Sequence, residues 1–185
     1  MTLLLWILII IGILIVLAFI NYYNKFVILG NRIDNSLSQI DVQLRKRADL
    51  VPNLVKTVKG YAKHEKKVFS DVTKARTEMM KATDLTEKVK AGNEMQKALK
   101  SIFALAENYP QLKSNENFLQ LQKELSAIED KVAYSRQFYN DSILSYNTAV
   151  ERFPGVIFAG IYGKGKKEYL QIPIESKAVP ELDFD

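Results

Sequence analysis

The sequence has no cysteine and a single histidine, His64. The lack of thiols excludes disulfide bonds, thiolate metal sites, a cysteine nucleophile and a lipid-modified N-terminal cysteine. One imidazole cannot form a histidine-rich metal centre. His64 stands among charged residues beside an expected helix junction, which predicts an exposed or capping side chain. Because spacing also assembles no Ser/His/Asp set, we expect no enzyme, and no cofactor, metal or small-molecule substrate.

Acidic and aromatic residues are scarce where the chain is most basic. Residues 45–76 hold ten Lys or Arg against three Asp or Glu, in a chain whose net charge is +5. Only Tyr61 and Phe69 interleave with these charges, so they make no stacking platform and no nucleic-acid partner is expected. The basic side chains form either a solvated helix face or a surface for an acidic protein or phospholipid head groups. The candidates for such a partner surface are Arg45, Lys46, Lys56, Lys59, Lys63, Lys66 and Lys67.

A long uncharged run lies near the start of the sequence. Leu3 to Ile20 contains no charged side chain, and as a helix with a rise of ~1.5 Å per residue it extends ~27 Å, close to the hydrocarbon thickness of a bilayer. A cleaved signal peptide would have a basic start, a shorter run and small residues before the cut. No Lys or Arg precedes this run, and Ala18-Phe19-Ile20-Asn21 is a poor cleavage site. We therefore predict a retained transmembrane anchor over residues 1–22.

The residues that flank the run predict its interfaces and its orientation. Trp6 lies near one end, and Tyr22, Tyr23 and Lys25 follow the other, where amphipathic rings and cations are favoured. Further basic residues follow at Arg32 and from residue 45 to 47. Because positive charge is retained on the cytoplasmic side, we expect a single-pass cell-membrane protein with its N-terminus outside and its large domain in the cytoplasm.

Beyond the run, apolar residues recur at alternating spacings of three and four, which is typical of helices packed side by side. The pattern predicts an all-α fold, an N-terminal transmembrane helix followed by a long antiparallel up-and-down four-helix bundle over residues 23–155. The first series runs from Tyr23 to Tyr61 and can be continued to Ala82. Pro52 is expected to kink it, and residues 60–65 are a candidate turn, although the pattern also permits a helix that runs on. Arg47 interrupts the series, which predicts a carboxylate partner on a facing helix.

Two further helices are expected. N-cap residue types at 83–86 precede a helix from Thr86 to Tyr109, with Val89, Leu99, Ile102, Phe103 and Ala106 inward. The last helix keeps strict four-three spacing from Phe118 to Phe153. In it, Tyr139-Asn140 and Tyr146-Asn147 recur seven residues apart on one face. That face is either a polar contact surface or a set of buried tyrosines beside small residues that admit close helix packing.

Phe153-Pro154-Gly155 ends the last helix, and residues 156–167 follow as an apolar and then basic segment. In an antiparallel bundle the last helix returns towards the bilayer, so this return segment is expected either at the membrane surface or folded against the bundle. Gly160 to Lys167 nearly matches a phosphate-binding loop but lacks the Ser or Thr and the strand-to-helix context. Residues 168–185 are expected to be an extended or disordered tail. The expected interface residues here are Phe158, Ile161, Tyr162, Lys164, Lys166 and Lys167.

Three blocks of the sequence resemble the LemA family of bacterial membrane proteins. They are residues 31–65, which include RKRADLVPNLVKTVKGYAKHE, residues 105–118, and the stretch from Tyr139-Asn140 to Phe153-Pro154-Gly155. The resemblance implies a long helical bundle behind one N-terminal anchor, no established enzymatic activity, and loose links to cell-envelope and membrane organisation, in one branch to magnetosome membrane formation. The family usually has an aromatic-rich, proline-containing stretch after Phe-Pro-Gly, where this chain has the basic, glycine-rich residues 163–167.

Two functions are consistent with these features. The first is a membrane-anchored helical scaffold of the cell envelope, with the lipid bilayer and further copies of the chain as partners. The alternative is an adaptor that recruits a membrane or cytoplasmic protein through the basic region 45–76.

Overall fold

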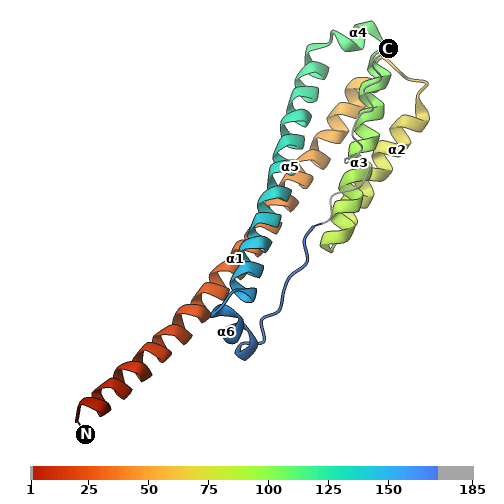
Figure 1. Cartoon of the computed structure of the whole chain (residues 1–185). Helices are drawn as coiled ribbons and strands as arrows, with labels where there is room; N and C mark the ends of the chain where they lie inside the picture. Colours follow the sequence, from red (N-terminus) through yellow and green to blue (C-terminus); the bar gives the residue numbers. More distant parts are fainter. Residues whose placement is uncertain (1, 171–185) are drawn as a thin grey trace, which may run out of the picture. The chain divides into compact units, whose positions relative to one another are not determined.

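The computed structural model describes residues 2–170 and is helical in that range, without strands (Figure 1). The described helices are α1 (Thr2–Lys59), α2 (Lys66–Lys81), α3 (Leu85–Ala106), α4 (Pro110–Lys113), α5 (Glu116–Glu151) and α6 (Gly155–Ile161). The expected tail from residue 171 onward lies outside the described residues. The chain forms two compact units, a first unit of Met1–Ile33 with Phe138–Asp185 and a second unit of Asp34–Gln137.

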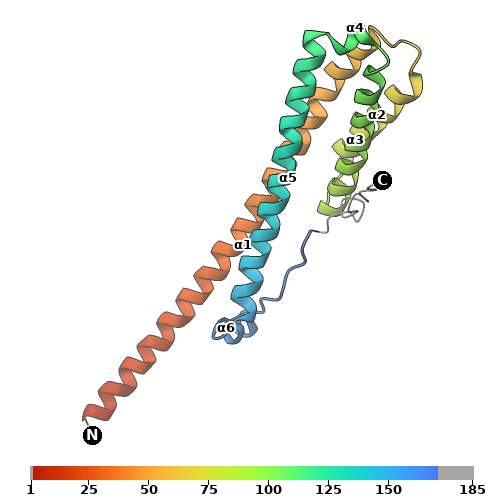
Figure 2. The same cartoon turned by 45° about the horizontal axis from the view of Figure 1, so that its top comes forward.

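The second unit is an up-and-down bundle of α1, α2, α3 and α5, in which consecutive long helices run antiparallel (Figures 1 and 2). The alternating apolar series supplies much of its core, as predicted, because that spacing keeps one face of each helix apolar. Tyr61, which the series also placed inward, is 39% exposed because α1 has ended at Lys59. Arg47 lies inside this core and is 1% exposed. The most deeply buried apolar side chains of the unit include Ile40, Leu44, Val51, Leu54, Val58, Val72, Met79, Met95, Ile102, Leu125 and Val132.

The turns of the second unit follow local chemistry. Helix α1 continues through Pro52 and ends at Lys59, and the predicted turn at residues 60–65 leads into α2, with His64 exposed in it. Asp84 caps α3, since its carboxylate accepts a hydrogen bond of 2.8 Å from the Glu87 N–H. Helix α3 ends at Ala106, three residues earlier than predicted, and Pro110 then opens the short helix α4, which the spacing did not predict.

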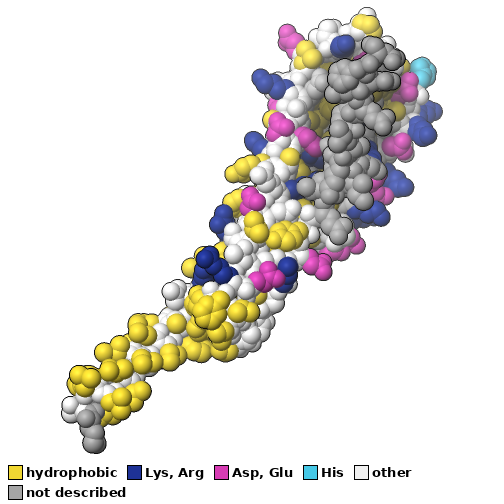
Figure 3. All heavy atoms as spheres, in the orientation of Figure 1, with side chains coloured by type: hydrophobic (Ala, Val, Ile, Leu, Met, Phe, Trp, Pro, Cys, Tyr) yellow, Lys and Arg dark blue, Asp and Glu magenta, His cyan; other side chains and the backbone are white. Residues whose placement is uncertain are grey.

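The first unit contains the apolar part of α1. Its side chains from Leu3 to Leu17 are exposed, and Figure 3 shows hydrophobic side chains covering this stretch on the face in view. Among the described helices, α1 alone is long and apolar enough to cross a membrane, with a window of mean hydropathy 3.4 and no buried residue. The other helices of the unit bury Tyr139, Ile143, Tyr146 and Ala159.

The inward position predicted for Phe153 is wrong, because this side chain is 76% exposed. Helix α5 ends two residues earlier, at Glu151, and residues 152–154 form a bend and turn before α6. The helical spacing that places Ala149 inward therefore no longer applies at Phe153.

Candidate membrane interface and neighbouring sites

Helix α6 lies against α1 at the end of the apolar run. The rings of Tyr22 and Phe158 stack with their centroids 4.5 Å apart and their planes 9° apart. Phe19 meets Phe158 edge-on at 5.0 Å. The Tyr162 hydroxyl donates a hydrogen bond of 2.8 Å to the Phe19 carbonyl oxygen. Aromatic pairs in these geometries stabilise a contact beyond the apolar area that they bury. The first part of the return segment is therefore the short helix α6, packed against the end of the run.

The other face of α6 is apolar and exposed. Val156, Ile157 and Ile161 are exposed, as is Phe153 just before the helix. Of the predicted interface residues, Phe158 and Tyr162 face the aromatic side chains of α1, and Ile161 is outward and exposed. The segment thus packs on the protein with one face and leaves an apolar face uncovered.

Gly155 makes the α5–α6 turn possible. A Cβ atom at this position would lie 2.1 Å from the Ala149 carbonyl oxygen and 3.3 Å from the Tyr22 ring. Real Cβ atoms do not approach a backbone oxygen so closely, so any larger residue must move one of the two helices. Glycine at this position thus allows α6 to pack closely against the end of α5 and against α1.

Two asparagines on α5 hold the chain that follows α6. Asn147 donates its amide hydrogen to the Lys167 carbonyl oxygen and accepts the Lys167 N–H, both at 2.8 Å. Asn140 does the same with Leu170, at 3.1 and 2.9 Å. Seven helical residues rise ~10.5 Å, and three extended residues cover ~10 Å. The heptad spacing of the asparagines therefore matches a three-residue step of extended chain.

Two lysine side chains strengthen the contact between Asn147 and the backbone of Lys167. The Lys166 ammonium lies 3.0 Å from the Glu151 carboxylate, whose hydrogen bond and charge raise the pKa of Lys166. The Lys167 ammonium lies 5.5 Å from the centre of the Tyr146 ring, and burial raises the pKa of that tyrosine. Two of the lysines expected at the membrane surface therefore contact α5. Tyr139 and Tyr146 are buried, as one interpretation of the repeat predicted. The asparagines bind the backbone of the same chain, so the polar contact surface of the other interpretation stays a prediction.

Replacing Asn147 with leucine is expected to release this segment. Leucine has a similar volume but cannot satisfy the Lys167 N–H and carbonyl groups, and unmet buried hydrogen bonds cost ~1–3 kcal/mol. Tryptic cleavage after Lys164, Lys166 or Lys167 should therefore accelerate about tenfold or more. Asn117→Leu, on an exposed position of α5, is the control; equal cleavage rates in the two variants would show that Asn147 does not hold the segment.

Buried charges connect three helices of the second unit. Arg47 on α1 donates one hydrogen bond to the Glu129 carboxylate on α5 and another, of 3.4 Å, to the Gly92 carbonyl oxygen on α3. Burial lowers the pKa of the Arg47 guanidinium, and the charge of Glu129 opposes that shift. The carboxylate partner predicted for Arg47 is therefore confirmed as Glu129. Asp41 and Lys88 form a second link, at 2.8 Å, and the hydrogen bond from Lys88 lowers the pKa of Asp41.

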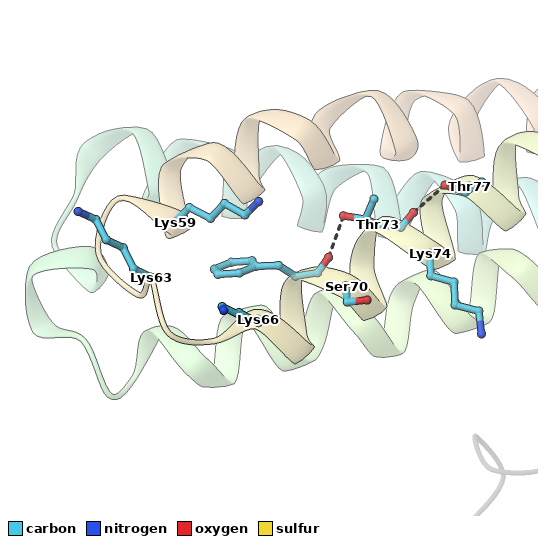
Figure 4. Close-up of a pocket in the computed structure, with 8 residues that line it drawn as sticks. Lys59, Lys63, Lys66, Ser70, Thr73, Lys74 and Thr77 are labelled. Carbon is cyan, nitrogen blue, oxygen red and sulfur yellow. Dashed lines mark hydrogen bonds between the residues drawn. The ribbon is translucent and has the colours of Figure 1, made fainter.

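The basic region forms a hollow at the α1–α2 turn (Figure 4). Its volume is about 730 Å³, and it is lined by Lys59, Lys63, Lys66 and Lys74 with Phe69, Ser70, Thr73 and Thr77. The Thr73 and Thr77 hydroxyls donate to backbone carbonyls of α2, so the other side-chain donors of the lining belong to the four lysines and Ser70. Three of the seven predicted surface residues meet here, and Lys74 joins them. Arg45, Lys46, Lys56 and Lys67 are exposed outside this lining, and Arg45 pairs with Asp41 at 3.1 Å.

Residues 2–170 were predicted to hold neither metal ligands nor a true phosphate-binding loop, and the structure shows how the relevant side chains and the near-match lie. No group of three His, Asp or Glu side chains in that range could hold a metal ion. The near-match at Gly160 to Lys167 begins inside α6 and continues as extended chain to Leu170, so within this range it opens no helix. A phosphate-binding loop holds its anion at the N-terminus of the helix that follows it. No helix follows residues 160–167 within the described part of the chain.

The chain is similar in sequence to magnetosome proteins and to a LemA protein. It is 27% identical over 194 residues to the magnetosome protein MamQ 2 of Paramagnetospirillum magneticum, a match that covers 89% of this chain and 71% of that protein. It is 25% identical to the magnetosome protein MamQ of Magnetospirillum gryphiswaldense, covering 80% of this chain and 64% of that one. It is also 25% identical to protein LemA of Metamycoplasma hominis, over 66% of this chain and 57% of that one. The LemA family model matches residues 36–184, and the chain belongs to the LemA family.

Proposed function

We propose that this protein is a membrane-anchored helical scaffold of the cell envelope that contacts the bilayer at two places, through the apolar run of α1 and through α6. In that role it organises membrane or assembles with further copies of itself. The observation that carries the proposal is the exposed apolar face of α6, fixed by Phe158 and Tyr162 to the end of the only described helix able to span a membrane. The relatives named as magnetosome proteins are consistent with a role at membranes.

The packing of α6 supports a retained anchor. Phe19 belongs to the apolar run and also contacts Phe158 and Tyr162, and Tyr22 stacks on Phe158. Removal of the run as a signal peptide would delete these contacts from the folded protein. The basic residues Lys25 and Arg32 follow the run, which supports an N-terminus outside and the helical domain in the cytoplasm.

The proposal predicts that Ile161 enters the lipid. Trp6 is the only tryptophan, so a Trp6→Phe, Ile161→Trp chain carries a single reporter on the exposed face of α6. After reconstitution into vesicles, its emission should shift to the blue and should be quenched at least twofold by lipids brominated on their acyl chains, because an indole at the interface contacts those chains.

The matched control places the reporter at Tyr134, which is 67% exposed on α5, in a Trp6→Phe, Tyr134→Trp chain. This reporter should be insensitive to brominated lipids. Equal quenching at both positions would show that the signal comes from non-specific contact with the vesicles and not from insertion of α6. The absence of quenching at position 161 would contradict the second membrane contact.

A second candidate function is an adaptor that recruits an acidic protein, and the lysine-lined hollow at the α1–α2 turn favours it. The four lysines that line this hollow attract a carboxylate-rich surface, and the attraction weakens with salt. A partner identified by cross-linking from this hollow should bind the purified protein. Lys63→Glu with Lys66→Glu should abolish that binding, whereas Lys113→Glu, at an exposed position of α4, should not.

A further inference from the structure

A hollow between α1 and α5 in the first unit begins where the apolar run ends. Its volume is about 450 Å³, and it is lined by Tyr22, Lys25, Leu29, Arg32, Ser145, Thr148, Ala149, Arg152 and Phe153. Three of the lining residues are cations and none is a carboxylate. Lys25 lies five residues beyond Ile20, or ~7.5 Å along a helix, which is the depth of lipid head groups if the run spans the bilayer.

The cations of this hollow are the groups that can bind an anion. The Ser145 and Thr148 hydroxyls donate to the carbonyls of Asp141 and Leu144, at 2.8 and 2.7 Å, so their hydrogens are already engaged. Lys25 lies over the Tyr22 ring, 5.8 Å from its centre. Within residues 2–170 neither Lys25 nor Arg152 forms an ion pair. Arg32, at the far end, lies over the Phe138 ring at 5.0 Å. Lys25 and Arg152 are thus two cations that line one hollow and have no carboxylate partner among the described residues.

The walls of the hollow favour an amphipathic ligand. Tyr22, Leu29 and the exposed ring of Phe153 line it beside the cations. The exposed side chains of Leu17 and Ile20 belong to the apolar run that precedes Tyr22 on α1. Inorganic phosphate would use only the cations, whereas a phospholipid would use the cations for its phosphate and the apolar residues for the start of its chains.

We infer that this hollow binds the phosphate group of an anionic glycerophospholipid, held by Lys25 and Arg152, with the polar head group extending towards Arg32. The inference deepens the proposed function, since it rests on the run as a span and names the lipid class that the scaffold recognises. Arginine and lysine together suit this ligand, because the guanidinium can bind two phosphate oxygens and the ammonium provides a compact charge.

The test measures the thermal stabilisation of the full chain, purified in detergent, by added phosphatidylglycerol, phosphatidylcholine or inorganic phosphate. A ligand that binds only the folded state raises the melting temperature in proportion to its affinity. Phosphatidylglycerol should bind at least tenfold more tightly than phosphatidylcholine. Lys25→Gln with Arg152→Gln should remove that preference and leave the melting temperature without lipid unchanged. Stabilisation by inorganic phosphate equal to that by phosphatidylglycerol would overturn the assignment to lipid.

The matched control is Lys164→Gln with Lys166→Gln, which removes two exposed cations of the same unit that lie outside the hollow. This pair should retain the preference for phosphatidylglycerol. Equal losses in the two pairs would show that general charge and not the hollow selects the lipid, and would overturn the inference. The Ile161→Trp reporter separates this result from the proposed function: quenching by brominated lipid without any preference for phosphatidylglycerol would reject the head-group site and leave the second membrane contact intact.

Discussion

Replacing Glu129 with leucine is expected to destabilise the second unit by ~3 kcal/mol, whereas replacing Arg47 with leucine should cost less than ~1 kcal/mol or increase stability. The asymmetry follows from burial. The Arg47 side chain is 1% exposed and the Glu129 side chain 38%. Loss of the carboxylate leaves a guanidinium inside the core without its charge partner. Loss of the guanidinium leaves a carboxylate that water can reach.

Chemical unfolding followed by circular dichroism measures both variants and the Arg47→Leu, Glu129→Leu pair. The double variant should be close to the parent or more stable, because replacing this partly buried ion pair with two leucines removes the desolvation penalty of the guanidinium. Asp130→Leu, on the neighbouring exposed carboxylate of α5, should change stability by less than ~0.5 kcal/mol. A larger loss in Arg47→Leu than in Glu129→Leu would show that the guanidinium stabilises the bundle through more than its charge partner. The hydrogen bond to Gly92 is the contact that would then explain it.

The helical bundle could be predicted from the sequence because its determinants are local and periodic. The spacing that runs from Phe26 to Val58 lies on one face of a helix whatever packs against it. Residues 60–65 and 83–84 interrupt the helices through glycine and capping groups that act on their own neighbours. Arg47 is the informative exception. A cation inside an apolar series requires a partner, although periodicity alone does not say which of several carboxylates provides it.

The contacts of Asn140 and Asn147 could not be predicted in the same way. Their spacing of seven residues assigns them to one face of α5, and that much is visible in the sequence. The groups that cover the face belong to Lys167 and Leu170, which lie 20 and 30 residues further along a segment without periodicity. Backbone groups are present in every residue, so no side-chain pattern marks the segment that the asparagines bind.

The candidate sites also combine a feature that the sequence shows with one that it does not. A surplus of lysine between residues 45 and 76 is a count along the chain, and it does not show which ammonium groups converge. The turn after Lys59 brings Lys63 and Lys66 to the hollow that Lys74 also lines, while Lys46 and Lys56 lie outside it. The hollow beside Lys25 and Arg152 joins residues 127 positions apart. Convergence of this kind depends on the antiparallel path of the helices, so it becomes visible only in three dimensions.

Gly155→Ala is expected to detach α6 from α1. The added methyl group meets the Ala149 carbonyl oxygen at 2.1 Å, a backbone atom fixed in helix α5. Overpacking of this kind costs ~1–3 kcal/mol. Helix α6 has only seven residues, so its position depends on the contacts with Phe19 and Tyr22 more than on its own helical stability. Hydrogen exchange of residues 156–162 should therefore accelerate at least tenfold, and quenching of the Ile161→Trp reporter by brominated lipid should fall.

Gly160→Ala makes the same chemical change in the same helix at a position where a Cβ has no neighbour within 4 Å. Alanine favours a helix over glycine by up to ~1 kcal/mol, so this variant should exchange as slowly as the parent or more slowly. Opposite effects of the two substitutions would show that the close approach at Gly155 positions α6, and that the second membrane contact depends on it. If Gly155→Ala exchanged as slowly as Gly160→Ala while the reporter remained quenched, α6 would have kept its place despite the added methyl group, and the close approach at Gly155 would not be what positions it.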